Sequence, residues 1–172
     1  MSPLVLLGSS RGDGNTARAL DAAFGEAWLD LSAYSIAFYD YRHNYPPRDD
    51  FFSLAEMMTR TWDIVLATPV YWYAMSAQMK VFVDRWSDLV TTRKDLGRAL
   101  AGRRLWLLAT SADPDFPPGF ETPFALTARY MDMVYGGGLH LQCADEATLG
   151  EADRATLLAF ADKITAGPRA AA

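Results

Sequence analysis

The fold is decided by a stretch near the N-terminus, which reads Leu4-Val5-Leu6-Leu7-Gly8-Ser9-Ser10-Arg11-Gly12-Asp13-Gly14-Asn15-Thr16. A short, fully apolar run ends at a loop of glycines and hydroxyl residues, and a helical pattern follows at once. This order predicts a buried strand, a loop and a helix that begins at the loop. The first N–H groups of a helix have no partner within it, and the positive end of the helix dipole lies there too. The sequence therefore predicts a phosphate-binding site in this loop.

The residues of the loop narrow the kind of phosphate. A Walker A loop has a lysine before its final Ser or Thr, but this loop ends in Gly14-Asn15-Thr16. The dinucleotide fingerprint requires Gly-x-Gly-x-x-Gly, and the glycines at 8, 12 and 14 do not have that spacing. The polar side chains that remain suit a terminal phosphate monoester that stays bound rather than one that is transferred. They are Ser9, Ser10, Arg11, Asn15 and Thr16.

Length and composition limit the class of protein. The 172 residues fit a single domain, 1–172, with 51% apolar and 22% charged residues. No apolar run approaches the roughly 18 residues of a membrane span, and the formal net charge of -5 argues against nucleic acid as a partner. The single cysteine, Cys143, excludes an internal disulfide and a multi-cysteine metal site. We therefore predict a soluble cytoplasmic protein that neither spans a membrane nor binds nucleic acid.

The periodicity of apolar residues predicts a chain in which strands and helices alternate. The predicted strands cover 4–7, 34–39, 64–67, 103–109 and 139–143, and the predicted helices cover 15–29, 50–61, 76–91, 121–134 and 151–165. This alternation implies a parallel sheet with helices on both faces, an α/β three-layer α-β-α sandwich. Five strands favour the flavodoxin-like order 2-1-3-4-5, whose ligand crevice lies beyond the carboxyl ends of the first and third strands.

A second informative stretch follows the third predicted strand. It reads Thr68-Pro69-Val70-Tyr71-Trp72-Tyr73-Ala74-Met75-Ser76-Ala77-Gln78-Met79-Lys80, with Asp84-Arg85 beyond it. A proline directly after a strand is expected to end the ladder of hydrogen bonds. The aromatic residues behind it would lie at the mouth of the sheet, where they can flank a planar heterocycle.

Together the two stretches resemble the NADPH-dependent FMN reductases, which are relatives of flavodoxin and of the quinone reductases. The family pattern is a Gly-Ser-x-Arg-x-x-Gly/Ser-x-Thr loop after strand 1 and a Pro-x-Tyr loop after strand 3, followed by a helix with Lys and Asp-Arg. Here the first loop runs from Gly8 to Thr16, the second is Pro69-Val70-Tyr71, and Lys80 and Asp84-Arg85 follow. The resemblance extends to about residue 143.

The resemblance implies bound FMN. Its phosphate would be held by Ser9, Arg11, Gly14, Asn15 and Thr16. Its isoalloxazine ring would lie along Pro69, Val70, Tyr71 and Trp72, and the third crevice loop would approach the other edge of the ring at its start, Thr110-Ser111-Ala112.

Two features set this chain apart from its relatives. Family members often carry a Gly-Gly pair in the third crevice loop, whereas this chain has Ala112-Asp113-Pro114 and a longer proline-rich loop over 112–119. Some relatives carry a cysteine cluster for an iron–sulfur centre before the second helix. Residues 40–50 contain no cysteine, so that subtype is excluded.

The resemblance further implies a flavin-dependent oxidoreductase. NADPH or NADH would deliver a hydride and leave, and a quinone, a nitro or azo compound or a free flavin would then accept the electrons, in a ping-pong sequence. No side chain is expected to act as a catalytic acid. The alternative is a flavodoxin-like electron carrier with protein partners. Arg11 and the Pro69-Val70-Tyr71 loop favour the reductase, because flavodoxins usually have a phosphate loop rich in Thr and Gly, without arginine.

The remaining reactive side chains are predicted to be structural. Ion pairs along a helix are expected for Lys80, Asp84 and Arg85, and local hydrogen bonds for the two histidines, His43 and His140. Cys143 is expected to be a small buried hydrophobic residue.

Aromatic residues are abundant, at 13% of the chain. Several of them are predicted to lie near helix or loop surfaces, and exposed aromatic patches commonly mark interfaces. We therefore predict a homodimer or homotetramer with the ligand crevice near the interface. The residues concerned are Trp62, Trp72, Tyr73, Trp86 and Tyr130.

Overall fold

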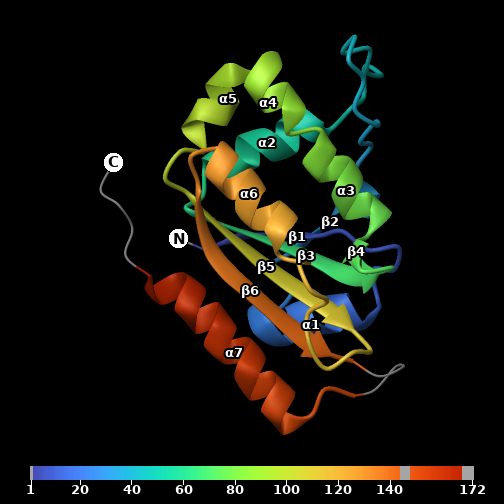
Figure 1. Cartoon of the computed structure of the whole chain (residues 1–172), viewed down its shortest axis with the longest axis vertical. Helices are drawn as coiled ribbons and strands as arrows, with labels where there is room; N and C mark the ends of the chain where they lie inside the picture. The colour runs from blue at the N-terminus through green and yellow to red at the C-terminus, as the bar shows by residue number, and fades with distance from the viewer. Residues whose placement is uncertain (1, 144–147, 168–172) are drawn as a thin grey trace.

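A parallel sheet forms the middle layer of the protein, as the computed structural model in Figure 1 shows for residues 2–143 and 148–167. The ends of the predicted 1–172 domain fall outside these described residues. The strand order is β2-β1-β3-β5-β6, and a short β4 pairs antiparallel with β3. Counting the parallel strands alone, this is the predicted order 2-1-3-4-5, so the flavodoxin-like α/β prediction is confirmed. The strands are β1 (Leu4–Leu7), β2 (Leu29–Asp30), β3 (Asp63–Tyr71), β4 (Ala74–Met75), β5 (Arg104–Ser111) and β6 (Val134–Gln142).

Helices cover both faces of the sheet (Figure 1). One face carries α1 (Asn15–Phe24) and α7 (Glu151–Ala166). The other carries η1 (Leu31–Ala33), α2 (Phe51–Thr59), α3 (Ala77–Asp84), α4 (Ser87–Thr91), α5 (Lys94–Ala99) and α6 (Thr122–Tyr130). Of the helices in the described ranges, none has the length and apolar content that a membrane crossing requires.

Strand β1 shows why a continuous apolar run suits this position. Successive side chains of a strand point to opposite faces of the sheet. Val5 and Leu7 pack into the core under α1 and α7, while Leu4 and Leu6 pack into the core on the other face. All four residues are buried, as expected for a parallel strand covered on both sides.

The second strand lies earlier in the chain than predicted. The structure places β2 at Leu29–Asp30, and residues 34–39 form no strand. Carboxylates bind this segment in place of a neighbouring strand. Asp50 Oδ2 accepts from the N–H of Ser35 and Asp49 Oδ2 accepts from the N–H of Ala37, each at 2.8 Å. The prediction of a strand over 34–39 was therefore wrong, because distant side chains satisfy the backbone there.

The third strand continues through the proline that was expected to end it. Pro69 pairs in register with Thr110 of β5, and β3 extends to Tyr71. The N–H of Gly8 donates to the carbonyl of Ala67 at 2.8 Å. Alternate residues of a strand direct their N–H and C=O groups to the same side, so the backbone nitrogen of Pro69 also faces the β1 side. Strand β1 has ended by this point, so no hydrogen bond of the sheet is lost there although proline has no N–H.

The predicted helix over 76–91 is divided in two. Helix α3 ends at Asp84 and α4 begins at Ser87. At this point the N–H groups of Trp86, Asp88 and Leu89 donate to carbonyls three residues earlier instead of four. Such bonds tighten a helix and redirect it. The short helix α5 was not predicted. It packs so closely on α4 that a Cβ on Gly97 would lie 2.2 Å from the Leu89 carbonyl oxygen.

A strained turn joins β3 to β4. Its two central residues, Trp72 and Tyr73, have φ values of 49° and 65°, a region that bulky residues rarely adopt. Asn-Gly is the favoured pair where both central residues have positive φ. We expect Trp72→Asn combined with Tyr73→Gly to raise the free energy of unfolding of the monomer by about 1–2 kcal/mol, measured by urea denaturation in dilute protein so that subunit contacts do not contribute.

The control separates backbone strain from the removal of an exposed aromatic. Phe38 is 80% exposed and has no positive φ, so Phe38→Asn should leave the urea midpoint nearly unchanged. An equal gain in both proteins would show that strain at the turn is not the cause.

Candidate functional site

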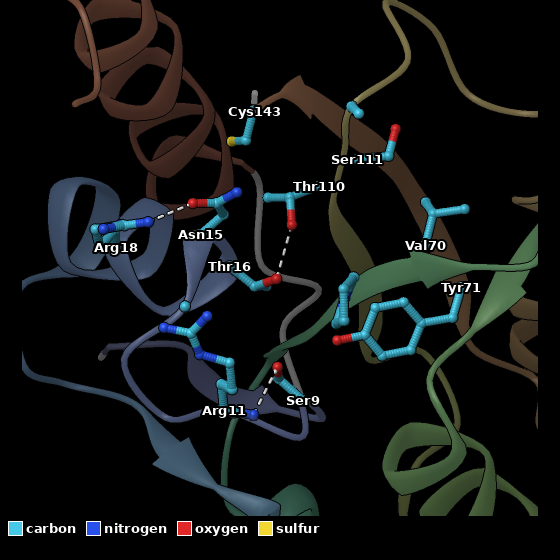
Figure 2. A pocket seen from close by; sticks show the side chains of 13 residues that line it. Ser9, Arg11, Asn15, Thr16, Arg18, Val70, Tyr71, Thr110, Ser111 and Cys143 are labelled. Carbon is cyan, nitrogen blue, oxygen red and sulfur yellow. Dashed lines mark hydrogen bonds between the residues drawn. The ribbon is translucent and has the colours of Figure 1, made fainter. Parts of the chain in front are cut away.

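A pocket opens at the carboxyl ends of β1, β3 and β5, where the strand order predicts the crevice (Figure 2). Its volume is about 540 Å³, within the range of sites that hold a cofactor or drug-sized ligand. Every predicted site residue except Trp72 lines it. These residues are Ser9, Arg11, Gly14, Asn15, Thr16, Pro69, Val70, Tyr71, Thr110 and Ser111. Ala112, expected at the start of the third crevice loop, also lines the pocket, and so do Arg18 and Cys143, which sequence reasoning did not select.

The structure places Trp72 outside this pocket. Its side chain is 93% exposed at the tip of the β3–β4 hairpin. Tyr71, the residue before it, does face the pocket, and its hydroxyl lies 3.2 Å from Ser10 Oγ. Because this hydrogen bond links the two predicted loops, Tyr71 is held against the wall of the pocket.

One end of the pocket is built by the N-terminus of α1. The N-cap residue, Gly14, has no side chain to accept from the first turn, and the first turn contains no acidic residue. The first intrahelical bond runs from the Arg18 N–H to the Gly14 carbonyl at 3.0 Å. The preceding N–H groups have no helical partner and lie where Asn15 and Thr16 line the pocket. This end of the pocket therefore suits an anion.

Side chains add to the donors at this end. Thr16 Oγ1 and Thr110 Oγ1 are 2.7 Å apart across the pocket floor, and both residues are buried (Figure 2). The amide oxygen of Asn15 accepts from Arg18 Nη2, and Arg11 Nε forms an exposed ion pair with Asp13 at 3.2 Å. Two guanidinium groups thus belong to the lining, and none of the described residues that line the pocket is acidic. Helical spacing could have identified Arg18, because a residue three places after Asn15 lies on the same face of the helix.

A buried hydrogen-bond chain fixes the two loops relative to each other. Ser76, the N-cap of α3, donates from Oγ to the Gly8 carbonyl at 2.6 Å and accepts from the Met79 N–H at 3.1 Å. Its own N–H donates to Thr68 Oγ1 at 3.0 Å. Helix α3 approaches so closely that a Cβ on Gly8 would lie 2.7 Å from Met79 Cβ, so this position requires glycine. Sequence reasoning missed Ser76, although a serine before a helical pattern is a typical N-cap signal.

A serine and histidine pair lies where β5 leads into the third crevice loop. Ser111 Oγ, at the end of β5, lies 2.8 Å from Nε2 of His140 on the neighbouring strand β6. Burial lowers the pKa of His140, although Asp113, Asp115 and the Pro114 carbonyl act in the opposite direction. Nearby, Cys143 is buried as predicted, and burial raises the pKa of its thiol.

The charged residues of α3 and α4 form structural pairs, as predicted. Lys80 Nζ and Asp84 Oδ1 are 2.5 Å apart on the exposed side of the helix. Arg85 is fully buried and pairs with both Asp49 and Asp88 at 2.7 Å.

Comparison with known proteins decides the family. The family model described as NADPH-dependent FMN reductase matches residues 1–115 of the chain. The chain belongs to this family. The predicted family and enzyme class are thereby confirmed: the protein is an NAD(P)H-dependent FMN oxidoreductase, with FMN and NAD(P)H as its cofactors.

Individual relatives agree with this assignment. This reductase is 29% identical over 123 residues to YwqN of Bacillus subtilis, described as an NAD(P)H-dependent FMN-containing oxidoreductase. The match covers 66% of this chain and 68% of YwqN.

Two solved structures share the fold. One is described as the Trp repressor binding protein from Bacillus subtilis, with a TM-score of 0.70, 23% identity and coverage of 95% of this chain and 97% of the other. The other is described as an NADPH-quinone reductase from P. pentosaceus, with a TM-score of 0.70, 19% identity and coverage of 98% and 100%. At these identities the likeness concerns the fold alone.

Proposed function

We propose that the pocket at the carboxyl ends of β1, β3 and β5 holds FMN, with the phosphate at the N-terminus of α1. One observation carries this proposal: a continuous pocket joins an acid-free, donor-rich helix end to an aromatic wall at Tyr71. The phosphate would meet the first-turn N–H groups and the side chains of Ser9, Arg11, Asn15 and Thr16. The ring would lie toward Pro69, Val70 and Tyr71 on one side and Thr110 and Ser111 on the other.

When bound, FMN supplies the redox chemistry, since it can take up a hydride and pass on the electrons. The residues of this chain would bind and orient it. Tyr71, hydrogen-bonded to Ser10, fixes one wall of the pocket. The buried hydrogen bonds of Ser76 set the distance between the two loops.

We propose that NAD(P)H and the electron acceptor use this crevice in turn, which gives ping-pong kinetics. The acceptor would be a small planar molecule, namely a quinone, a nitro or azo compound or a free flavin. The aromatic wall at Tyr71 supports this class, because planar rings stack favourably on aromatic side chains.

Anaerobic stopped-flow mixing with NADPH tests the reductase function. The FMN-loaded protein should lose its flavin absorbance near ~450 nm, whereas free FMN under the same conditions should not. A flavin band that persists would contradict the proposal and would favour a flavodoxin-like carrier that receives electrons from a protein partner.

We also propose a homodimer or homotetramer. Trp72, Tyr73 and Tyr130 are exposed by 93%, 71% and 75%, as an aromatic interface would require. The surface prediction was wrong for Trp86, which is buried in the core beside Phe82.

A further inference from the structure

The contact between Ser111 and His140 defines the polarity of one side of the pocket. Ser111 lines the pocket at the end of β5, and His140 lies behind it on β6. Their Oγ and Nε2 atoms are 2.8 Å apart, a short hydrogen bond. Phe116 covers the imidazole, with 5.1 Å between the ring centroids. Both atoms are therefore held in a defined geometry.

The direction of this hydrogen bond follows from the surroundings of the ring. The Pro114 carbonyl favours a proton on the imidazole, and we assign that proton to Nδ1, the ring nitrogen that does not face Ser111. Nε2 is then an acceptor and takes the hydroxyl proton of Ser111. The Asp113 carbonyl is a weaker competitor for that proton, since it lies 3.5 Å from Ser111 Oγ.

With its proton directed to His140, Ser111 Oγ has only lone pairs to offer other partners. One of them accepts from the N–H of Asp113 at 3.2 Å. The remaining one is available to a ligand in the pocket that Ser111 lines. This makes Ser111 an acceptor in a lining that otherwise consists mainly of donors.

We propose that His140 is a positioning residue of the FMN site, which holds the Ser111 hydroxyl as a hydrogen-bond acceptor for an N–H group of the flavin ring. The inference rests on the proposed FMN binding. Oxidised isoalloxazine carries one ring N–H group, and the third crevice loop is the wall proposed for the ring edge. Protonation of His140 would reverse the bond, because Nε2–H would then donate to Ser111 and the hydroxyl would turn its own proton toward the ligand.

Two charged groups near the imidazole affect the pKa of His140. Asp113 and Asp115 in the 112–119 loop favour the protonated ring, whereas burial favours the neutral one. Burial outweighs the two aspartates, so the pKa of His140 is lowered and the neutral imidazole is favoured.

The test measures FMN dissociation constants by quenching of flavin fluorescence at pH 7.5. Ser111→Ala and His140→Leu should each raise the dissociation constant roughly three- to tenfold, the loss expected for one hydrogen bond. The double variant should be no weaker than either single one, since both remove the same bond. His140→Gln should restore most of the affinity, because its amide oxygen can accept from Ser111. His43→Leu, at the other histidine, should bind FMN like the unmodified protein.

A pH series supplies a second readout. Below pH ~6.5 the dissociation constant should rise more steeply in the unmodified protein than in Ser111→Ala. The FMN phosphate also gains a proton near pH ~6, but this contribution is shared by both proteins and cancels in the comparison.

Two results would overturn the inference. One is that His140→Leu binds FMN as tightly as the unmodified protein. The other is that the dissociation constant of the double variant rises by the product of the two single increases. Failure of the unmodified protein to bind FMN would instead refute the proposed function, so the two failures are distinguishable.

Discussion

Replacing Arg85 with methionine is expected to lower the free energy of unfolding by about 3–5 kcal/mol, the cost of leaving buried charges without their partner. The Arg85 side chain is fully buried between Asp49 and Asp88, with 2.7 Å to each carboxylate. Its guanidinium also lies 3.5 Å from the centroid of the Tyr45 ring and donates to the Ala37 carbonyl. The loss can be measured by urea denaturation at pH 7.

The matched control is Arg93→Met. Arg93 forms a comparable pair with Asp95 at 2.9 Å, but its side chain is partly exposed to solvent. An exposed pair contributes at most about 1 kcal/mol. Similar losses in the two variants would show that burial of Arg85 is not what makes it important.

The effect of Arg85→Met should also depend on pH. Burial by itself would raise the pKa of Asp49, but the hydrogen bonds from Arg85 and from the Ala37 N–H outweigh it, so the pKa is lowered. The ionised carboxylate therefore stabilises the folded protein above its unfolded pKa of ~3.9, and this stabilisation is lost as the pH falls through the folded value. Without Arg85 a protonated Asp49 is preferred, so the difference between the two proteins should shrink between pH 7 and pH 4.

Replacing Asn15 with aspartate is expected to weaken FMN binding about 30- to 100-fold. A new carboxylate beside a phosphate costs roughly 2–3 kcal/mol at the effective dielectric of a protein surface. Figure 2 shows the amide oxygen of Asn15 directed at Arg18 and its nitrogen pointing away from it. Aspartate keeps an acceptor for Arg18 but replaces the donor, so the fold should be preserved while the phosphate site becomes repulsive.

Two controls make this result specific. Riboflavin lacks the phosphate, so its dissociation constant should be nearly unchanged in Asn15→Asp. Asn44→Asp makes the same chemical change at an exposed loop residue and should not affect FMN binding. Equal losses of FMN and riboflavin affinity would contradict a phosphate site at the N-terminus of α1.

Local patterns were sufficient where the decisive contacts lie close together in the sequence. The apolar run of β1, the small-residue loop and the start of α1 were predicted as one unit, and the structure has them in that order. The strand order followed from the alternation of strands and helices, because parallel strands need crossover connections and these are right-handed. That order predicts that the loops at Gly8 and Thr68 lie beside each other.

Long-range contacts explain what was missed. Residues 34–39 have the composition of a strand. Their backbone N–H and C=O groups, however, form hydrogen bonds with the side chains of Asp49, Asp50 and Arg85 instead of with a neighbouring strand. Pro69 remains within β3 because β1 has already ended beside it. Neither outcome can be predicted from the local residues, since each depends on which hydrogen-bonding groups of a distant segment lie beside them.

By itself, then, the amino-acid sequence determined the flavodoxin-like sheet, the small-residue loop before α1 and most of the residues that line the pocket, because these depend on periodicity, helix-end chemistry and strand order. Only the tertiary structure moved Trp72 to an exposed hairpin tip, brought Arg18 and Cys143 to the pocket and set His140 behind Ser111. The physical reason is that hydrogen bonds and burial between distant segments depend on packing, and spacing along the chain does not encode where two such segments meet.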